Sequence, residues 1–232
     1  MRPFVSGQPE TAIVKSDDFS EPKLGLHWQW NHNPIDAAWS LTERPGFLRL
    51  KTNRVVPNIY LAPNTLTQRM EGPTCSGVVK MDVSKMKDGD CAGFAAFNNE
   101  TGALAIRKQG RKVVLQFEEW SVKLTQKDKT VEKENVNEKV VESVALDKKQ
   151  TCIWLRIDGD FRPGERGGKD AANFYYSLDG EQWTKIGTND YRMRFDWQRF
   201  FMGSKFAIFC YATKKLGGWV DVDSFTYHVD EK

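Results

Sequence analysis

Residues 173–187 read NFYYSLDGEQWTKIG, and this stretch decides the fold class. The pair Asp179-Gly180 separates a run of aromatic residues from a second run that contains Trp183 and Ile186. Asp-Gly between two such runs is the strongest short-range signal for a β-hairpin, because these residues tolerate the positive φ angles of a tight turn. The stretch therefore predicts two antiparallel strands joined by a short turn.

The rest of the chain repeats this pattern. Short runs rich in Val, Ile, Phe, Tyr and Trp are bounded by Gly, Pro, Asn and Asp, which is typical of strands and turns. The clearest runs are SGVVKMDVS (76–84), AGFAAFNN (92–99), CIWLRIDGD (152–160), KFAIFCYAT (205–213) and WVDVDSFTYH (219–228). No long segment keeps an apolar period of 3.6 residues, and the absence of a tandem repeat argues against a propeller. About a dozen strands in one domain predict an all-β sandwich of two antiparallel sheets.

Charge and hydropathy exclude two classes of partner. The 232 residues carry 34 Lys and Arg against 31 Asp and Glu, a net charge of +3. A nucleic-acid surface needs a concentrated basic excess, so we expect no nucleic-acid partner. No apolar run approaches the roughly 20 residues that span a bilayer, so we expect no membrane partner. The stretch MRPFVSGQPE (1–10) has no apolar h-region and does not predict a signal peptide.

The motifs of common hydrolases are missing from the sequence. It contains no GxSxG elbow and no HExxH zinc motif. The adjacent carboxylates Glu118 and Glu119 do not suit a glycosidase, because neighbouring residues of a strand point to opposite faces and do not flank one bond. We therefore expect no catalysis by this chain alone.

The four cysteines form no CxxC pair, and a zinc site is not indicated. Cys152 and Cys210 lie in apolar runs and are expected to be buried free thiols. A disulfide between Cys75 and Cys91 is left open by the sequence.

The eight Trp residues include a pair in HWQWNHNP (27–34), where polar and aromatic residues alternate. A strand here places Trp28, Trp30 and His32 on one face and the polar residues between them on the other. Exposed aromatic rings stack on the apolar faces of sugars, while amide and guanidinium groups bind hydroxyls. The candidate carbohydrate-binding residues are Gln29, Trp30, Asn31, His32, Gln68 and Arg69. The alternative is that the aromatic rings are buried and that Arg69 pairs with a carboxylate. Trp154 and Trp219 are expected in the core.

A set of longer motifs carries a family resemblance over about residues 16–228. The motifs are LGLHWQWNHNP (24–34), WSLTERPGFLRLKT (39–52), NTLTQR (64–69), EGP (71–73), MKDGDCAGFAAF (86–97), YYSLDGEQW (175–183) and KFAIFCYATKKLGGWVDVDSF (205–225). In this order they resemble the C-terminal β-sandwich module of glycoside hydrolase family 43 β-xylosidases and α-L-arabinofuranosidases. The resemblance implies a concanavalin A-like jelly-roll sandwich, of a kind classed as xylan-binding carbohydrate-binding modules.

The resemblance also implies a domain organisation. Residues 1–15 are expected to be the linker from an upstream catalytic propeller, and residues 16–232 a single β-sandwich carbohydrate-binding module. In related enzymes a Phe on a loop of this module reaches the active site of the propeller, and the matching stretch here contains Phe200 and Phe201. A secreted or periplasmic location is implied by a polysaccharide substrate.

No cofactor is required by this reading, but a structural calcium is a further expectation. Many sandwich carbohydrate modules hold calcium near their first and last strands, where this chain has Asp17, Asp18, Asp221 and Asp223. Calcium takes six to eight oxygen ligands, which carboxylates supply. The alternative is that these residues are ordinary surface acids near the chain ends.

The leading hypothesis is a non-catalytic accessory module that binds xylan, arabinoxylan or xylo-oligosaccharides. The alternative is a structural module without sugar binding of its own, which completes the active site of its propeller domain. A sandwich glycosidase and a laminin-G-like protein-interaction domain share the fold class and stay open, because fold alone does not decide function.

Overall fold

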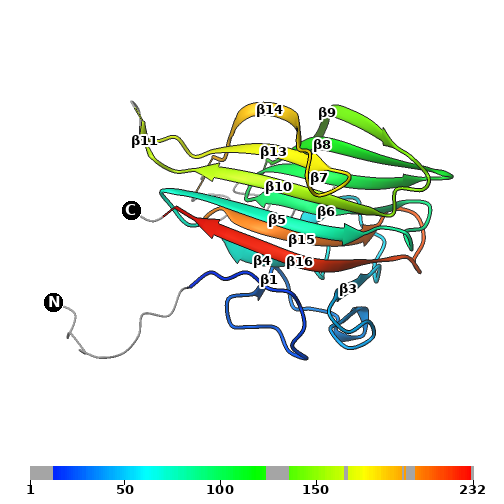
Figure 1. The fold of residues 1–232 in the computed structure, drawn as a ribbon. Helices are drawn as coiled ribbons and strands as arrows, with labels where there is room; N and C mark the ends of the chain where they lie inside the picture. Colours follow the sequence, from blue (N-terminus) through cyan, green and yellow to red (C-terminus); the bar gives the residue numbers. More distant parts are fainter. Residues whose placement is uncertain (1–12, 124–135, 165–166, 195, 197–201, 231–232) are drawn as a thin grey trace, which may run out of the picture.

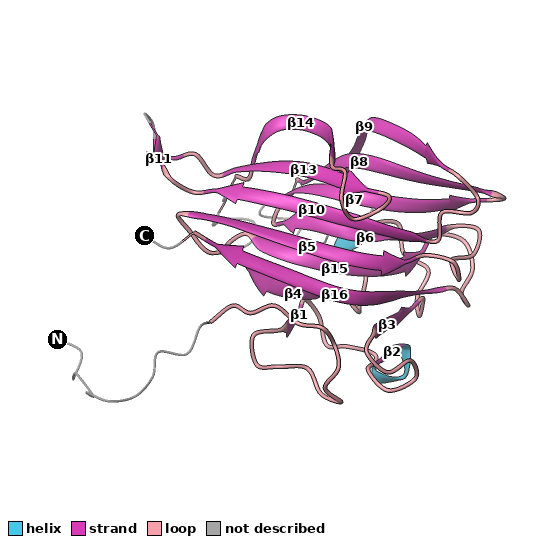
Figure 2. Ribbon diagram, viewed as in Figure 1, coloured by secondary structure: helices cyan, strands magenta, loops and turns pink. Residues whose placement is uncertain are grey.

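The structure is a computed structural model that describes residues 13–123, 136–164, 167–194, 196 and 202–230. Figure 1 shows two sheets stacked face to face, with their strands running across the view in similar directions. Regular structure in the described residues is almost wholly strand, apart from two short 3₁₀ helices, η1 (Asp36–Ala38) and η2 (Ile59–Leu61) (Figure 2). The prediction of an all-β sandwich of two antiparallel sheets is confirmed.

Each of the two sheets has seven strands. Sheet A has the order β14 (Thr184–Arg192), β13 (Ala171–Ser177), β10 (Cys152–Asp160), β5 (Thr74–Asp82), β16 (Trp219–Val229), β3 (Leu48–Lys51), β2 (Trp39–Ser40). Sheet B has the order β1 (Gln29–Trp30), β4 (Leu66–Arg69), β15 (Lys205–Ala212), β6 (Asp90–Phe97), β7 (Glu100–Gln109), β8 (Lys112–Val122), β9 (Val136–Leu146). A small ribbon pairs β11 (Pro163–Gly164) with β12 (Gly167–Gly168).

The hairpin that the Asp-Gly pair predicts is β13 and β14. Phe174 lies opposite Ile186 in the antiparallel register. The turn residue Gly180 has φ +84°, which a residue without a side chain adopts at no steric cost. The Asp179 carboxylate accepts hydrogen bonds from the backbone N–H of Glu181 and of Gln182, both at 2.8 Å. This carboxylate closes the turn.

The main core lies between the two sheets and follows from strand alternation. Every second residue of β10 is fully buried, while the residues between them are only half-buried. Rings from the two sheets meet in this layer: Phe117 of β8 lies 4.6 Å from Phe174 of β13, and Phe206 of β15 lies 6.0 Å from Phe225 of β16. Because aromatic rings bury large apolar areas, these contacts hold the sheets together.

A second apolar layer covers the outer face of sheet B, and we call it the outer cluster. The segment between β3 and β4 folds back over the sheet and places Val56, Ile59 and Tyr60 there. The Tyr60 ring lies 5.5 Å from that of Phe97, and its hydroxyl donates a hydrogen bond to the Thr101 hydroxyl at 3.0 Å. The strand residues beneath include Ala95, Ala103, Ala105, Trp120, Ala207, Phe209 and Tyr211, all buried. The chain therefore fills this face of the sandwich with its own residues.

The outer face of sheet A is different, and it corrects one expectation. Trp154 and Trp219 are half-buried and stand on this face rather than in the core. The reason is phase: Ile153 and Leu155 on either side of Trp154 are fully buried, so the indole points the other way. Strand propensity alone does not set this phase.

The four thiols and residues 13–28, which precede β1 and are called the lead-in segment, complete the fold. Cys75, Cys91, Cys152 and Cys210 are all free, and only Cys152 is not fully buried. Among the described residues, packing on the sandwich begins at Val14, which is buried in the core, one residue before the expected end of the linker. In the described part of the chain, no helix is long and apolar enough to cross a membrane.

Candidate functional site

Three polar side chains lie together at one end of sheet B, where Gln29 and Arg69 are exposed and Lys205 is half-buried. Gln29 of β1 lies opposite Thr67 of β4, and Arg69 of β4 lies opposite Lys205 of β15. The Lys205 ammonium donates a hydrogen bond to Gln29 Oε1 at 3.0 Å. We call Gln29, Arg69 and Lys205 the β4 surface. The sequence predicts a binding role for Gln29 and Arg69 but not for Lys205. Lys205 begins the run KFAIFCYAT, and the sequence does not show that this run pairs with NTLTQR.

Lys205 has an unusual environment for a lysine. Partial burial lowers its pKa below the ordinary value, and the nearby positive charge of Arg69 lowers it further. Burial disfavours the charged form of an amine, and a like charge does the same. Two cations held this close on one surface indicate a place where an acidic or hydrogen-bond-accepting group of a partner is favoured.

Gln68 is not part of this surface, and its role in sugar binding stays a prediction. The side chain is buried between the inward-facing Leu66 and Met70. Its Oε1 accepts a hydrogen bond from the Lys15 backbone N–H at 2.6 Å, and its Nε2 donates to the Lys15 carbonyl at 3.0 Å. The two hydrogen bonds of the Gln68 side chain therefore fix the lead-in segment to β4.

Trp30 also has a structural environment rather than an open ring. It packs against the main core, and its ring lies 5.2 Å from that of Trp39. The alternation that the sequence predicts is confirmed here: Trp28 and Trp30 face the core and Gln29 faces outward. Trp30 is therefore no free platform for a sugar.

Asn31 and His32 follow β1 and hold local structure. The Asn31 backbone N–H donates to the Thr65 carbonyl at 2.9 Å. The His32 Nε2 lies 2.7 Å from the Tyr60 carbonyl, and this contact connects the segment to the outer cluster. The His32 ring is exposed on its other side.

The predicted contact with a catalytic domain falls on Phe200 and Phe201, which lie outside the described residues. The neighbouring Met202 packs against the outer cluster, and its carbonyl accepts a hydrogen bond from Asn98 Nδ2 at 3.2 Å. This contact anchors the end of the loop to the β6–β7 turn.

The adjacent carboxylates Glu118 and Glu119 point in different directions, as strand alternation predicts. Glu118 is fully buried on the outer face of sheet B and binds Arg107. Glu119 accepts a hydrogen bond from Thr188 of β14, at 2.6 Å. The two groups do not flank a common space.

The acidic residues expected to bind calcium do not lie together. Asp221 is buried, and both of its oxygens are within 3.0 Å of guanidinium groups, those of Arg49 and Arg44. Asp223 pairs with Lys80 at 2.6 Å, beside a bulge that interrupts the alternation of β16. Asp18 is exposed and bonds to Ser20 of its own loop.

Among the described residues, no group of three or more His, Cys, Asp or Glu side chains is arranged to hold a metal ion. The three predicted carboxylates therefore do not fit one calcium site, because two of them are already paired with basic groups. Calcium binding elsewhere stays a prediction.

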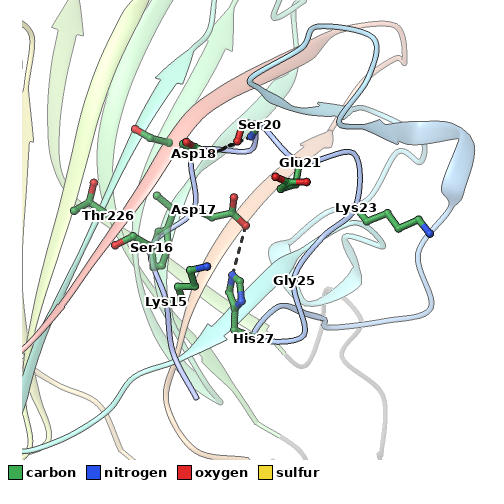
Figure 3. Close-up of a pocket in the computed structure, with 12 residues that line it drawn as sticks. Lys15, Ser16, Asp17, Asp18, Ser20, Glu21, Lys23, Gly25, His27 and Thr226 are labelled. Carbon is green, nitrogen blue, oxygen red and sulfur yellow. Dashed lines mark hydrogen bonds and ion pairs between the residues drawn. The ribbon is translucent and has the colours of Figure 1, made fainter. Parts of the chain in front are cut away.

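A hollow of about 460 Å³ lies between the lead-in segment and β16 (Figure 3). Asp17 is one of the residues that line it. The Asp17 carboxylate accepts hydrogen bonds from Trp28 Nε1 and from the Phe19 backbone N–H, both at 2.8 Å. His27 Nε2 lies 3.4 Å from the same carboxylate, on the side shown by the dashed line in Figure 3. Because the Asp17 carboxylate already accepts these hydrogen bonds, it holds the lead-in segment in place and is not free to act as a general base.

Comparison with known proteins places this geometry in a family. The chain matches the family described as beta xylosidase C-terminal concanavalin A-like domain over residues 16–228. It is 32% identical to a beta-xylosidase of Formosa agariphila, a match that covers 97% of this chain and 37% of the relative. It is 26% identical to a putative beta-xylosidase of Escherichia coli K12, with 97% and 40% covered.

Solved structures agree with these sequence matches. An engineered GH43 glycoside hydrolase with endo-xylanase and exo-arabinofuranosidase activity superimposes with a TM-score of 0.84 and 31% identity, over 100% of this chain and 43% of that protein. A bifunctional GH43-CE protein of Bacteroides eggerthii gives a TM-score of 0.77 and 37% identity, over 100% and 27%. The chain thus spans less than half the length of these relatives. It belongs to the family of beta-xylosidase C-terminal concanavalin A-like domains.

Proposed function

We propose that this chain is a non-catalytic accessory module of a larger xylan-degrading glycoside hydrolase, and that it packs against the catalytic domain through the β4 surface. The observation that carries this proposal is the double hydrogen bond between Gln68 and the Lys15 backbone. These bonds hold Lys15, near the first described residues, against β4, the strand that also carries Arg69. A domain joined upstream would therefore enter beside this strand.

Two further observations support a structural role over sugar binding by the predicted residues. Gln68 and Trp30 are engaged within the chain, and the outer cluster fills the remaining outer face of sheet B. The family resemblance adds that the catalytic carboxylates of such enzymes lie in a propeller, and that a Phe of the stretch matching Phe200–Phe201 reaches it in related enzymes. Met202, which directly follows this stretch, packs against the outer cluster, on the same sheet as the β4 surface. A secreted or periplasmic location follows if the parent enzyme acts on polysaccharide.

The experiment that tests this proposal uses the parent catalytic domain and this chain produced separately and mixed. We expect the mixture to hydrolyse an aryl xyloside at least tenfold faster than the catalytic domain alone. Arg69→Ala and Lys205→Ala weaken the complex, because they remove the two cations of the β4 surface. Arg111→Ala is the matched control, since Arg111 is an exposed arginine at the distant β7–β8 turn.

Sugar binding by the β4 surface is the competing function, favoured by the exposed Gln29 and Arg69. It predicts that the isolated chain binds xylohexaose and that Arg69→Ala abolishes this binding. Such a result, together with no association between the two proteins, would overturn the proposal.

A further inference from the structure

The outer face of sheet A carries an aromatic patch on strands that face solvent. On β10, Ile153, Leu155 and Ile157 are fully buried, so Trp154 and Arg156 point outward. The solvated face of an antiparallel sheet ordinarily carries polar residues. Large aromatic rings on this face therefore differ from the ordinary pattern and need a physical explanation.

Arg156 organises the rings around it. Its guanidinium carbon lies 5.5 Å from the ring centre of Tyr175, directly opposite on β13, and 5.9 Å from that of Trp183. The Asp158 carboxylate accepts two hydrogen bonds from the same guanidinium, at 2.7 and 2.9 Å. The bidentate carboxylate and the two rings orient the guanidinium, so the chain itself sets the arrangement of the patch.

Trp154 extends the patch along β10. The Lys80 ammonium lies 5.4 Å from its ring centre. On its other side the β13–β14 turn closes in, since a Cβ atom added to Gly180 would lie 3.1 Å from the indole. Trp154 is thus partly covered, and Tyr175 and Trp183, which are also half-buried, form the rest of the patch.

A polar hollow of about 310 Å³ adjoins Arg156 on the same face. The register places four of its lining residues side by side across β13, β10, β5 and β16: Asn173, Asp158, Ser76 and His228. Neighbouring strands are about 4.8 Å apart, so this row extends over about 14 Å. Ser76 and His228 make no side-chain hydrogen bond to another described residue, which leaves a hydroxyl and an imidazole for a ligand.

The chemistry of the patch fits a sugar chain. A pyranose ring offers an apolar C–H face for stacking and a rim of hydroxyls for hydrogen bonds, and the patch has rings beside a row of polar groups. The charges of Arg156 and Lys80 are compensated by Asp158 and Asp223, while the exposed Lys185, 5.9 Å from the Tyr175 ring centre, is a further cation of the patch. An uncharged ligand stacks on the rings without displacing the two ion pairs. We propose that the outer face of sheet A is a glycan-binding site, in which Tyr175 and Trp183 stack on an uncharged oligosaccharide.

This site is independent of the proposed function. It lies on the outer face of sheet A, and the β4 surface lies on the outer face of sheet B, on the other side of the main core. A module bound to its catalytic domain through sheet B still presents sheet A to a polysaccharide.

The test is calorimetric titration of the whole chain with xylohexaose and with cellohexaose. We expect binding of at least one of these, and a loss of affinity of at least tenfold in Tyr175→Ala and in Trp183→Ala. Trp219→Ala is the matched control, because Trp219 is also half-buried on this face, under Arg49 at 5.2 Å, but away from the hollow. Arg69→Ala is expected to bind as the unchanged chain does.

Amide chemical-shift mapping of the unchanged chain gives a second readout that needs no substitution. Shifts confined to residues 154–158 and 173–175 support the site, even where an aromatic substitution prevents folding. The proposal is overturned if neither sugar binds, or if binding persists in Trp183→Ala and the shifts map elsewhere. Loss of binding in Arg69→Ala alone would transfer sugar binding to the β4 surface, a result distinct from a failure to associate with the catalytic domain.

Discussion

Arg107 of β7 and Glu118 of β8 form a bidentate ion pair on the outer face of sheet B, where the Glu118 side chain is fully buried. The two N–O distances are 2.5 and 2.8 Å, and Trp120 Nε1 donates a third hydrogen bond to Glu118 at 3.0 Å. Glu138 of β9 approaches the same guanidinium at 2.5 Å. The Glu118 carboxylate is therefore hydrogen-bonded through both of its oxygens, although it lies in the apolar layer of the outer cluster.

Glu118→Gln is expected to lower the free energy of unfolding by about 3–5 kcal/mol, because it leaves the half-buried Arg107 with the exposed Glu138 as its remaining carboxylate partner. Urea unfolding followed by tryptophan fluorescence measures this change. Glu138→Gln serves as control and is expected to cost about 1 kcal/mol or less, since that pair is partly exposed. Equal stability of Glu118→Gln and the unchanged chain would show that the pair contributes nothing.

Gln68→Ala is expected to release the lead-in segment and to cost about 1–3 kcal/mol, because the Lys15 backbone N–H and carbonyl both lose their partner. Limited proteolysis near residue 15 is expected to become several-fold faster. Gln116→Ala is the matched control, since Gln116 makes a single bond to Ser143 on a more open strand. An unchanged cleavage rate in Gln68→Ala would show that the Gln68–Lys15 hydrogen bonds do not hold the lead-in segment in place.

Asp221→Asn is expected to cost about 3 kcal/mol, because it leaves Arg49 and Arg44 without their shared buried carboxylate. Millimolar calcium is expected to leave the thermal midpoint of the unchanged chain where it is. Asp223→Asn, which breaks a half-exposed pair with Lys80, is expected to cost about 1 kcal/mol or less. A calcium-dependent rise in the midpoint that Asp221→Asn removes would restore this carboxylate as a calcium ligand.

Stability is expected to fall at alkaline pH because burial holds thiols protonated in the folded chain, Cys75, Cys91 and Cys210 among them. Burial raises the pKa of Cys75 to about 11 and that of Cys91 to about 12, above the ordinary value of 9.0. The unfolded chain ionises these thiols first, so their contribution to stability is complete below pH 9. It declines as the pH rises through 11 and 12, by roughly 1.4 kcal/mol per pH unit for each thiol.

Urea midpoints measured between pH 8 and 12 check this expectation. Cys91→Ala is expected to flatten the decline between pH 9 and 12. Cys152→Ser, at the half-buried thiol of β10, is the control and is expected to retain it. A decline that is identical in Cys91→Ala and in the unchanged chain would assign the alkaline loss to other groups.

Local pattern predicted the parts of the fold that depend on neighbours in the chain. Asp179-Gly180 predicted the β13–β14 turn because the turn is closed by its own residues. The alternation of His27 to His32 predicted the inward faces of Trp28 and Trp30. The family motifs predicted the sandwich itself.

Pattern failed where a partner far along the chain satisfies a polar group. NTLTQR has polar residues on both faces of its strand, and Gln68 is buried only because Lys15, 53 residues away, supplies its hydrogen bonds. Asp221 and Asp223 were expected to bind calcium together, but the register of β16 shifts between Val222 and Ser224. Arg49 and Arg44, far away in the sequence, bind Asp221 instead. Neither the distant hydrogen-bond partner nor the register shift can be read from the neighbouring residues in the sequence.

The amino-acid sequence by itself therefore determined the strands, the tight turns and the family, since alternation and turn chemistry act over a few residues. Only the tertiary structure decided which faces stay open. The segment that carries Tyr60 covers sheet B, while Tyr175 and Trp183 are left at the surface of sheet A. The physical reason is that alternation assigns a residue to one side of a strand, whereas burial of that side depends on what the rest of the chain lays over it.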